Sequence, residues 1–196
     1  MIIDFRSKIG QIFTTNEGYD IQIIDYVDTK NVLINFVCRP EIQIWSTLQN
    51  IRNGQIKNPY HKSVYNKGYY GIGKYSARKN NVKTEEYIKW FSMFVRCYDD
   101  KYHEKQPTYI GCKVSDEFSN FQNFAEWYYH YKYPLEIDKD LLYEGNKIYS
   151  PHTCCLIPKE INTTINCKDM IQKLCTIYMK NIKWMFHIIL GQNYIN

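Results

Sequence analysis

No acidic residue stands between Glu41 and Glu85. The stretch from Arg52 to Thr84 carries eight basic side chains, although the whole protein has a net charge of only +5, so the rest of the chain carries −3. These basic residues are Arg52, Lys57, Lys62, Lys67, Lys74, Arg78, Lys79 and Lys83. Clustered positive charge is typical of a surface that neutralises phosphates, and the alternative is a solvated loop whose lysines only keep it soluble.

Tyrosines and glycines are interleaved with this basic stretch. Tyrosine rings can stack on bases or pack against sugars, and glycines let a backbone approach a ligand closely. Nineteen tyrosines in 196 residues also indicate an AT-rich genome, which accounts for part of this signal. We expect nucleic acid, duplex DNA in the first place, as the partner. The predicted nucleic-acid-binding residues are Lys57, Lys62, Lys67, Lys74, Arg78, Lys79, Tyr69 and Tyr70.

The composition suits one domain or two small ones with a buried core, since 44% of the residues are hydrophobic and 23% are charged. The start of the chain has no basic segment followed by a long apolar one, and no stretch approaches 18 apolar residues, so we expect neither an export signal nor a membrane span. Seven cysteines without a Cys-x-x-Cys pair indicate reduced thiols in a cytoplasm.

The first part of the chain reads as β-structure. Residues 19–26 are rich in β-branched side chains, residues 32–36 alternate, and the turn at 28–31 joins them into a predicted hairpin. A further short run at 41–45 would complete a small barrel-like sheet. Residues 52–83 have no clean period and contain Gly and Pro breakers, which predicts an extended or irregular linker.

Three helices are predicted downstream. The first begins at Thr84, where Glu85 and Glu86 suit the positive end of a helix dipole, and it ends at Asp99-Asp100. The second covers residues 117–131, and its aromatic side chains are predicted to be core. The third covers 168–190, and we expect core packing rather than a membrane surface or a partner helix. Its apolar stripe is Ile171, Leu174, Cys175, Tyr178, Ile182, Met185, Phe186 and Ile189.

Three aromatic motifs follow one another: Tyr87-x-x-Trp90-x-x-Met93-x-x-Arg96-Cys97-Tyr98, Tyr109-x-Gly111-Cys112-x-Val114 and Phe118-x-x-Phe121-x-x-Phe124. Together they resemble a segment of phage-encoded HNH-type endonucleases, some of which carry AP2-like DNA-binding modules. The stretch from Leu135 to Asn162, with Ser150-Pro151-His152-Thr153, is similar to an HNH core in altered form. The resemblance implies a ββα element near 135–165 that binds Mg²⁺ or Mn²⁺ where the site is active.

Carried over residue by residue, the resemblance makes Asp138 the first metal ligand and Asn162 the ligand on the helix. Lys139 falls where the general-base histidine of the family stands, and Thr153 falls where its central asparagine stands. A lysine of ordinary pKa is protonated at neutral pH and cannot accept a proton from water. His152 is the nearby candidate to replace it, so the catalytic candidates are Asp138, Lys139 and His152.

These observations predict an α+β protein with four parts. Residues 1–50 form a small β lobe, 51–83 a basic linker, 84–165 an HNH-like domain and 166–196 a C-terminal amphipathic helix. We expect a phage-type nucleic-acid-binding protein with little or no cleavage, in the cytoplasm of a bacterial host. Two alternatives are a phage inhibitor that binds a host CRISPR or restriction nucleoprotein, and an active metal-dependent HNH endonuclease.

Overall fold

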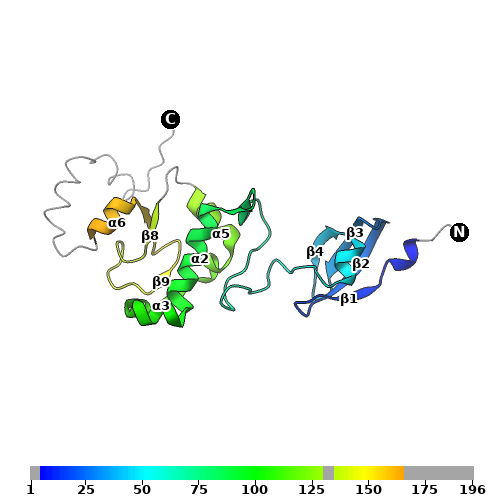
Figure 1. Cartoon of the computed structure of the whole chain (residues 1–196), viewed down its shortest axis with the longest axis horizontal. Helices are drawn as coiled ribbons and strands as arrows, with labels where there is room; N and C mark the ends of the chain where they lie inside the picture. Colours follow the sequence, from blue (N-terminus) through cyan, green and yellow to red (C-terminus); the bar gives the residue numbers. More distant parts are fainter. Residues whose placement is uncertain (1–4, 130–134, 166–196) are drawn as a thin grey trace, which may run out of the picture. The chain divides into compact units, whose positions relative to one another are not determined.

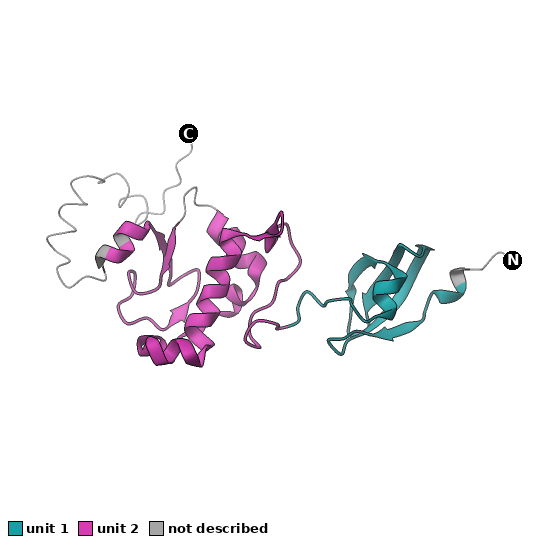
Figure 2. Cartoon of the chain, in the orientation of Figure 1, with its two compact units in different colours: residues 1–61 teal, residues 62–196 magenta. Residues whose placement is uncertain are grey.

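The computed structural model describes residues 5–129 and 135–165 (Figure 1). It divides into two compact units, of residues 1–61 and 62–196 (Figure 2). The boundary between His61 and Lys62 falls inside the stretch that the sequence predicts as a linker. The third predicted helix, 168–190, lies outside the described residues. No helix among the described residues combines the length and the apolar character needed to cross a membrane.

Unit 1 is a four-stranded antiparallel sheet in the order β1-β2-β3-β4, with a short helix on one face. Its elements are η1 (Phe5–Lys8), β1 (Ile12–Thr14), β2 (Asp20–Asp28), β3 (Asn31–Phe36), β4 (Arg39–Ser46) and α1 (Leu48–Arg52). The hairpin predicted at 28–31 is confirmed. Asp28 Oδ1 accepts hydrogen bonds from the backbone N–H groups of Lys30 (2.7 Å) and Asn31 (2.9 Å), which closes the turn.

The sheet of unit 1 is open, so the prediction of a barrel-like lobe is wrong in this respect. Closure would require the edge strands β1 and β4 to pair, but β1 has only three residues and pairs with β2 alone. The core therefore lies on one face of the sheet, where Ile21, Ile23 and Val32 are fully buried together with Ile51 from α1.

Unit 2 is mainly helical and also contains small two-stranded sheets. Its elements are β5 (Arg78–Lys79), β6 (Val82–Lys83), α2 (Glu85–Tyr98), α3 (Asp100–Lys105), η2 (Pro107–Tyr109), β7 (Lys113–Val114), α4 (Asp116–Ser119), α5 (Phe121–Tyr129), β8 (Glu136–Asp138), β9 (Ile148–Tyr149), β10 (Cys155–Ile157) and α6 (Lys159–Ile165). The helix predicted from Thr84 to the Asp99-Asp100 pair is confirmed as α2.

Helices α2 and α5 pack side by side around an aromatic core (Figure 1). Trp90 of α2 is fully buried, its ring lies 5.5 Å from that of Phe121, and its Nε1 donates to the carbonyl of Phe118 at 2.7 Å. The prediction that the aromatics of this region are core is thereby confirmed for Phe118, Phe121, Phe124 and Tyr128.

The second predicted helix is interrupted in the structure. Asn120 has an extended backbone (φ −85°, ψ 117°) between α4 and α5, whereas a continuous helix over 117–131 was expected. The reason is tertiary: the N–H of Phe121 donates to the carbonyl of Tyr69 at 2.9 Å instead of to a carbonyl one turn earlier. Hydrogen bonding to Tyr69, which is distant in the chain, thus interrupts the helix at Asn120.

Candidate functional site

The basic stretch of unit 2, residues 62–83, is anchored to the helical core. The N–H of Tyr69 donates to the carbonyl of Ser119 at 3.0 Å, which adds to the bond between Phe121 and the Tyr69 carbonyl. Gly68 lies directly against the rings of Trp90 and Phe94, and a Cβ atom at this position would come within 2.7 Å of Phe94 Cζ. This glycine therefore serves a close approach to the core and not to a ligand.

Gln122 holds the middle of the same stretch. Its Oε1 accepts from the N–H of Tyr75 and its Nε2 donates to the carbonyl of Tyr75, both at 2.9 Å, so the side-chain amide pairs with the backbone as a neighbouring strand would. The hydroxyl of Tyr75 donates to Glu126 Oε2, also at 2.9 Å. Nothing in the periodicity of the sequence pointed to Gln122 or Glu126, because their partners are 47 and 51 residues away.

The stretch ends in a tight hairpin that the sequence prediction missed. Strands β5 and β6 pair Arg78 with Lys83 and Lys79 with Val82, and the two turn residues, Asn80 and Asn81, have φ values of 50° and 62°. Two consecutive residues of positive φ are the signature of a type I′ turn, which asparagine tolerates better than most residues. The signal was present as Asn80-Asn81.

The predicted cations of the stretch are exposed. Lys74 Nζ lies 2.9 Å from Glu126 Oε2 in an exposed ion pair, and Arg78 Nη1 donates to the carbonyl of Asn81 at 2.8 Å. Among the described residues, Lys62, Lys67 and Lys79 form no ion pair and are exposed. The eight predicted nucleic-acid-binding residues do not all lie in one unit, because Lys57 belongs to unit 1, where it is exposed.

The two predicted tyrosines contribute to the interior as well as to the surface. The Tyr70 ring stacks on that of Tyr87, with centroids 6.0 Å apart and planes 9° apart, and the two hydroxyls are 3.3 Å apart. Burial, reinforced by the hydrogen bond with Tyr70, raises the pKa of the Tyr87 hydroxyl. Tyr70 remains 39% exposed, and Tyr69 is half-buried, with its backbone paired on both sides.

The predicted catalytic residues lie around two antiparallel strands followed by a helix. Strand β8 pairs with β10, and α6 follows β10 after a single residue. Asp138 is the last residue of β8, and its Oδ1 accepts from the backbone N–H groups of Asp140 and Leu141, both at 2.7 Å. Asn162 lies in α6 and is half-buried.

Lys139 is buried, with 8% of its surface exposed, and its ammonium group is fully engaged. Its Nζ donates to both carboxylate oxygens of Asp140, at 2.8 and 2.7 Å, and to the carbonyl of Asn146 at 2.8 Å. It also lies over the Tyr109 ring, 5.7 Å from the centroid. A paired ammonium ion in this setting has no lone pair with which to act as a base.

Thr153, which was carried over from the resemblance, and His152, the candidate replacement for the base, lie in the β9–β10 turn. Thr153 Oγ1 donates to the carbonyl of Ile148 at 2.7 Å and lies 2.8 Å from Ser150 Oγ. His152 is exposed, and its backbone N–H donates to Ser150 Oγ at 3.3 Å. Thr153 thus stabilises the turn through hydrogen bonds, while the imidazole of His152 faces solvent.

Few side-chain ligands for Mg²⁺ or Mn²⁺ are grouped around Asp138 in the described part of the chain. Such ions take several oxygen ligands, of which at least one or two are carboxylates. Within residues 5–129 and 135–165 no three His, Cys, Asp or Glu side chains are grouped to hold a metal ion. The predicted pair of Asp138 and Asn162 offers one carboxylate, next to the Lys139 ammonium group in the chain.

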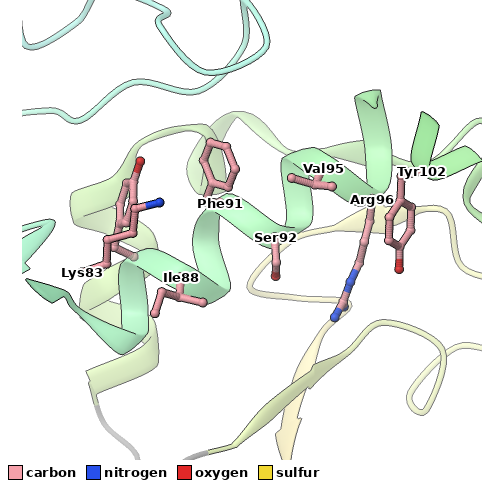
Figure 3. Close-up of a pocket in the computed structure, with 8 residues that line it drawn as sticks. Lys83, Ile88, Phe91, Ser92, Val95, Arg96 and Tyr102 are labelled. Carbon is pink, nitrogen blue, oxygen red and sulfur yellow. The ribbon is translucent and has the colours of Figure 1, made fainter. Parts of the chain in front are cut away.

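A groove of about 310 Å³ runs along one side of α2 and was not predicted (Figure 3). Its wall is mostly apolar, and Lys83 and Arg96 stand toward its two ends. The guanidinium carbon of Arg96 lies 5.9 Å from the centroid of the Tyr109 ring. The lining residues are Lys83, Tyr87, Ile88, Phe91, Ser92, Val95, Arg96 and Tyr102.

Comparison with known proteins assigns no family. The chain matches no protein-family model, and searches of curated proteins and of solved structures found no significant match.

Proposed function

We propose that this protein binds duplex nucleic acid through the exposed cations of residues 62–83. The observation that carries the proposal is that Lys62, Lys67 and Lys79 are exposed and form no ion pair among the described residues, on a backbone held by Ser119 and Gln122. Exposed cations neutralise phosphates and release counterions, and an anchored backbone has less conformational freedom to lose on binding.

We further propose that β8, β10 and α6 form a degenerate ββα element of the HNH type. Three features support this: the order strand, strand, helix, the place of Asp138 at the end of β8, and the place of Asn162 in α6. The engaged ammonium group of Lys139 supports binding without efficient cleavage, because no base stands beside Asp138 at that position.

The proposal is tested on one gel, with supercoiled plasmid and linear duplex, each with and without Mg²⁺ or Mn²⁺. We expect a mobility shift without nicking. Metal-dependent nicking that disappears in Asp138→Ala would instead establish an endonuclease. The absence of both shift and nicking would contradict both nucleic-acid functions.

A second candidate function, inhibition of a host CRISPR or restriction nucleoprotein, is favoured by a different observation. Trp45 is 54% exposed on β4, directly opposite Leu33 of β3, on the sheet face that α1 does not cover. Exposed tryptophan is enriched at protein interfaces. This function predicts weak binding to bare duplex and capture of a host nucleoprotein that is lost in Trp45→Ala.

A further inference from the structure

Helix α2 has two faces with the same helical spacing. The first repeats at positions i, i+3, i+4 and i+7 and is buried in the core of unit 2: Trp90, Met93, Phe94 and Cys97. The second repeats in the same way and lines the groove (Figure 3): Ile88, Phe91, Ser92 and Val95. Ile88 is 50% exposed and the other three are half-buried, so apolar surface of this face is open to solvent. A helix that is apolar on two faces is normally covered on both.

The shape of the groove face suits a second helix. Four side chains at positions i, i+3, i+4 and i+7 outline a hole that accepts a knob side chain from a helix packed alongside. The small Ser92 stands among larger neighbours and leaves room for that knob. Its hydroxyl donates to the carbonyl of Lys89 at 2.7 Å, so the serine needs no hydrogen-bond partner from a ligand.

Both ends of the groove are cationic. At one end, Lys83 is exposed, and its Nζ lies 5.8 and 5.7 Å from the centroids of the Tyr87 and Phe91 rings. At the other end, Arg96 is half-buried, and its Nη1 donates a long hydrogen bond of 3.5 Å to the hydroxyl of Tyr149. Among the described residues neither cation forms an ion pair, and no acidic side chain lines the groove. The guanidinium group of Arg96 therefore keeps donors for a carboxylate.

The distance between these ends favours an acidic helix over nucleic acid. The lining residues of α2 run from Tyr87 to Arg96, about 14 Å along the helix. A nucleic-acid strand carries a phosphate about every 3.4 Å, so it would press several phosphates against the apolar wall between the two cations. A peptide helix can instead present apolar side chains over these turns and carboxylates only at its two ends.

We propose that the α2 groove binds an amphipathic helix of a partner protein, with a knob in the hole around Ser92 and acidic side chains near Lys83 and Arg96. Recognition of a helix in a groove uses apolar anchors at this spacing. Apolar burial supplies the affinity, while the charges at the two ends fix the orientation and reject basic helices. This interaction is separate from nucleic-acid binding, because the lining residues on α2 lie outside residues 62–83.

Fluorescence anisotropy of labelled synthetic peptides, titrated with the full chain, tests the docking. The probes are amphipathic helices of about 16 residues, about 24 Å long, with leucine, phenylalanine or methionine at the apolar positions and glutamates at both ends. Their twins carry lysines in place of the glutamates. We expect the acidic peptides to bind, and the lysine twins to bind about tenfold more weakly because they meet cations at both ends.

Two variants of the protein locate the binding in the groove. Ile88→Asp should weaken the acidic peptides about tenfold, since an apolar anchor of the groove is lost. Ile110→Asp is the matched control, because Ile110 is 58% exposed in the same unit and does not line the groove. Lys83→Glu should weaken the acidic peptides and strengthen the lysine twins, each about fivefold, whereas Lys101→Glu, exposed outside the groove, should change neither. Circular dichroism verifies that all variants are folded.

Three outcomes would overturn the proposal. The first is that no acidic peptide binds, or that the acidic peptides and their lysine twins bind equally well. The second is that Ile88→Asp weakens the binding of duplex DNA and not that of the acidic peptides, which would assign the groove to nucleic acid. The third is a dimer in light scattering that dissociates in Ile88→Asp and not in Ile110→Asp, which would assign the groove to a second copy of the chain.

Discussion

Two polar stretches of unit 2 place their cations in opposite ways. In residues 62–83, the side chains of Lys62, Lys67 and Lys79 are exposed. In the stretch after β8, Lys139 is 8% exposed and bonded to Asp140 and to the Asn146 carbonyl. Residues 62–83 contain no acidic side chain, whereas the stretch after β8 contains Asp140 and Glu144.

The difference lies in what anchors each backbone. Residues 62–83 are held by the carbonyl of Ser119 and the side chain of Gln122, while Lys62, Lys67 and Lys79 remain exposed. In the stretch after β8, the side chain of Lys139 itself holds the backbone, because it bonds to the Asp140 carboxylate and to the Asn146 carbonyl. A cation is therefore available to a ligand only where other groups already satisfy the backbone.

The largest expected effect is that of Gly68→Ala, which tests whether the 62–83 stretch is packed against the core. The added Cβ would come within 2.7 Å of Phe94 Cζ and 3.0 Å of Trp90 Cζ2, both in rigid rings. We expect the free energy of unfolding to fall by about 2–3 kcal/mol from overpacking, measured by urea denaturation. Ser63→Ala, at an exposed position, is the control. Equal stability of the two variants would mean that the stretch is a loose loop.

The next effect concerns the anchor role of Lys139. Asp140→Ala leaves a buried ammonium group without its carboxylate. We expect the free energy of unfolding to fall by about 2 kcal/mol, which is less than for a fully buried pair because Asp140 is itself 53% exposed. Adding Lys139→Met should recover most of this loss, since an apolar side chain needs no partner. Unfolding of the single and double variants measures the coupling. A double variant that is less stable than Asp140→Ala would contradict the anchor role.

A smaller effect is expected for Gln122→Ala. The variant loses two hydrogen bonds to the Tyr75 backbone and leaves an N–H and a carbonyl to be satisfied by water, for about 1–1.5 kcal/mol. Asn123→Ala, at the exposed neighbouring position, should change the free energy of unfolding by less than about 0.5 kcal/mol. Hydrogen exchange should also become faster around Tyr75 in Gln122→Ala and not in the control.

The smallest effect depends on pH. The Tyr65 hydroxyl donates to Asp99 Oδ2 at 2.9 Å, and this bond, with that from the Tyr102 N–H, lowers the pKa of Asp99. Because the folded pKa lies below the unfolded value, the stabilisation is present above about pH 4 and is lost as the pH falls through the folded pKa. Tyr65→Phe should therefore lower the urea midpoint at pH 7, and its difference from wild type should shrink below about pH 4. A difference that is independent of pH would contradict this assignment.

Local signals in the sequence predicted much of the fold. The alternation of residues 32–36 and the turn at 28–31 predicted the β2–β3 hairpin, and the first-turn acids Glu85 and Glu86 marked the start of α2. Each of these signals acts over fewer than about ten residues, which is the range over which helix and hairpin patterns are read.

What could not be predicted depends on partners distant in the chain. Asn120 leaves the helix because Tyr69 bonds the next residue, and Gln122 pairs with Tyr75 across 47 residues. The sequence alone did not show that Lys74 is exposed whereas Lys139 is buried. The residue types indicated which segment carries the candidate site, but only the tertiary structure shows whether each cation faces solvent or the interior.

The central claim, that 62–83 presents cations to phosphates, is tested most directly by the salt dependence of duplex binding. Fluorescence anisotropy compares Lys62→Ala/Lys67→Ala/Lys79→Ala with Lys101→Ala/Lys105→Ala/Lys113→Ala, which removes the same charge from exposed positions of the same unit. We expect the slope of log K against log salt to become shallower by up to about 2.7 in the first variant, at about 0.9 per phosphate contact, and to stay unchanged in the second. Equal slopes in the two variants, or no binding by the wild-type protein, would contradict the account.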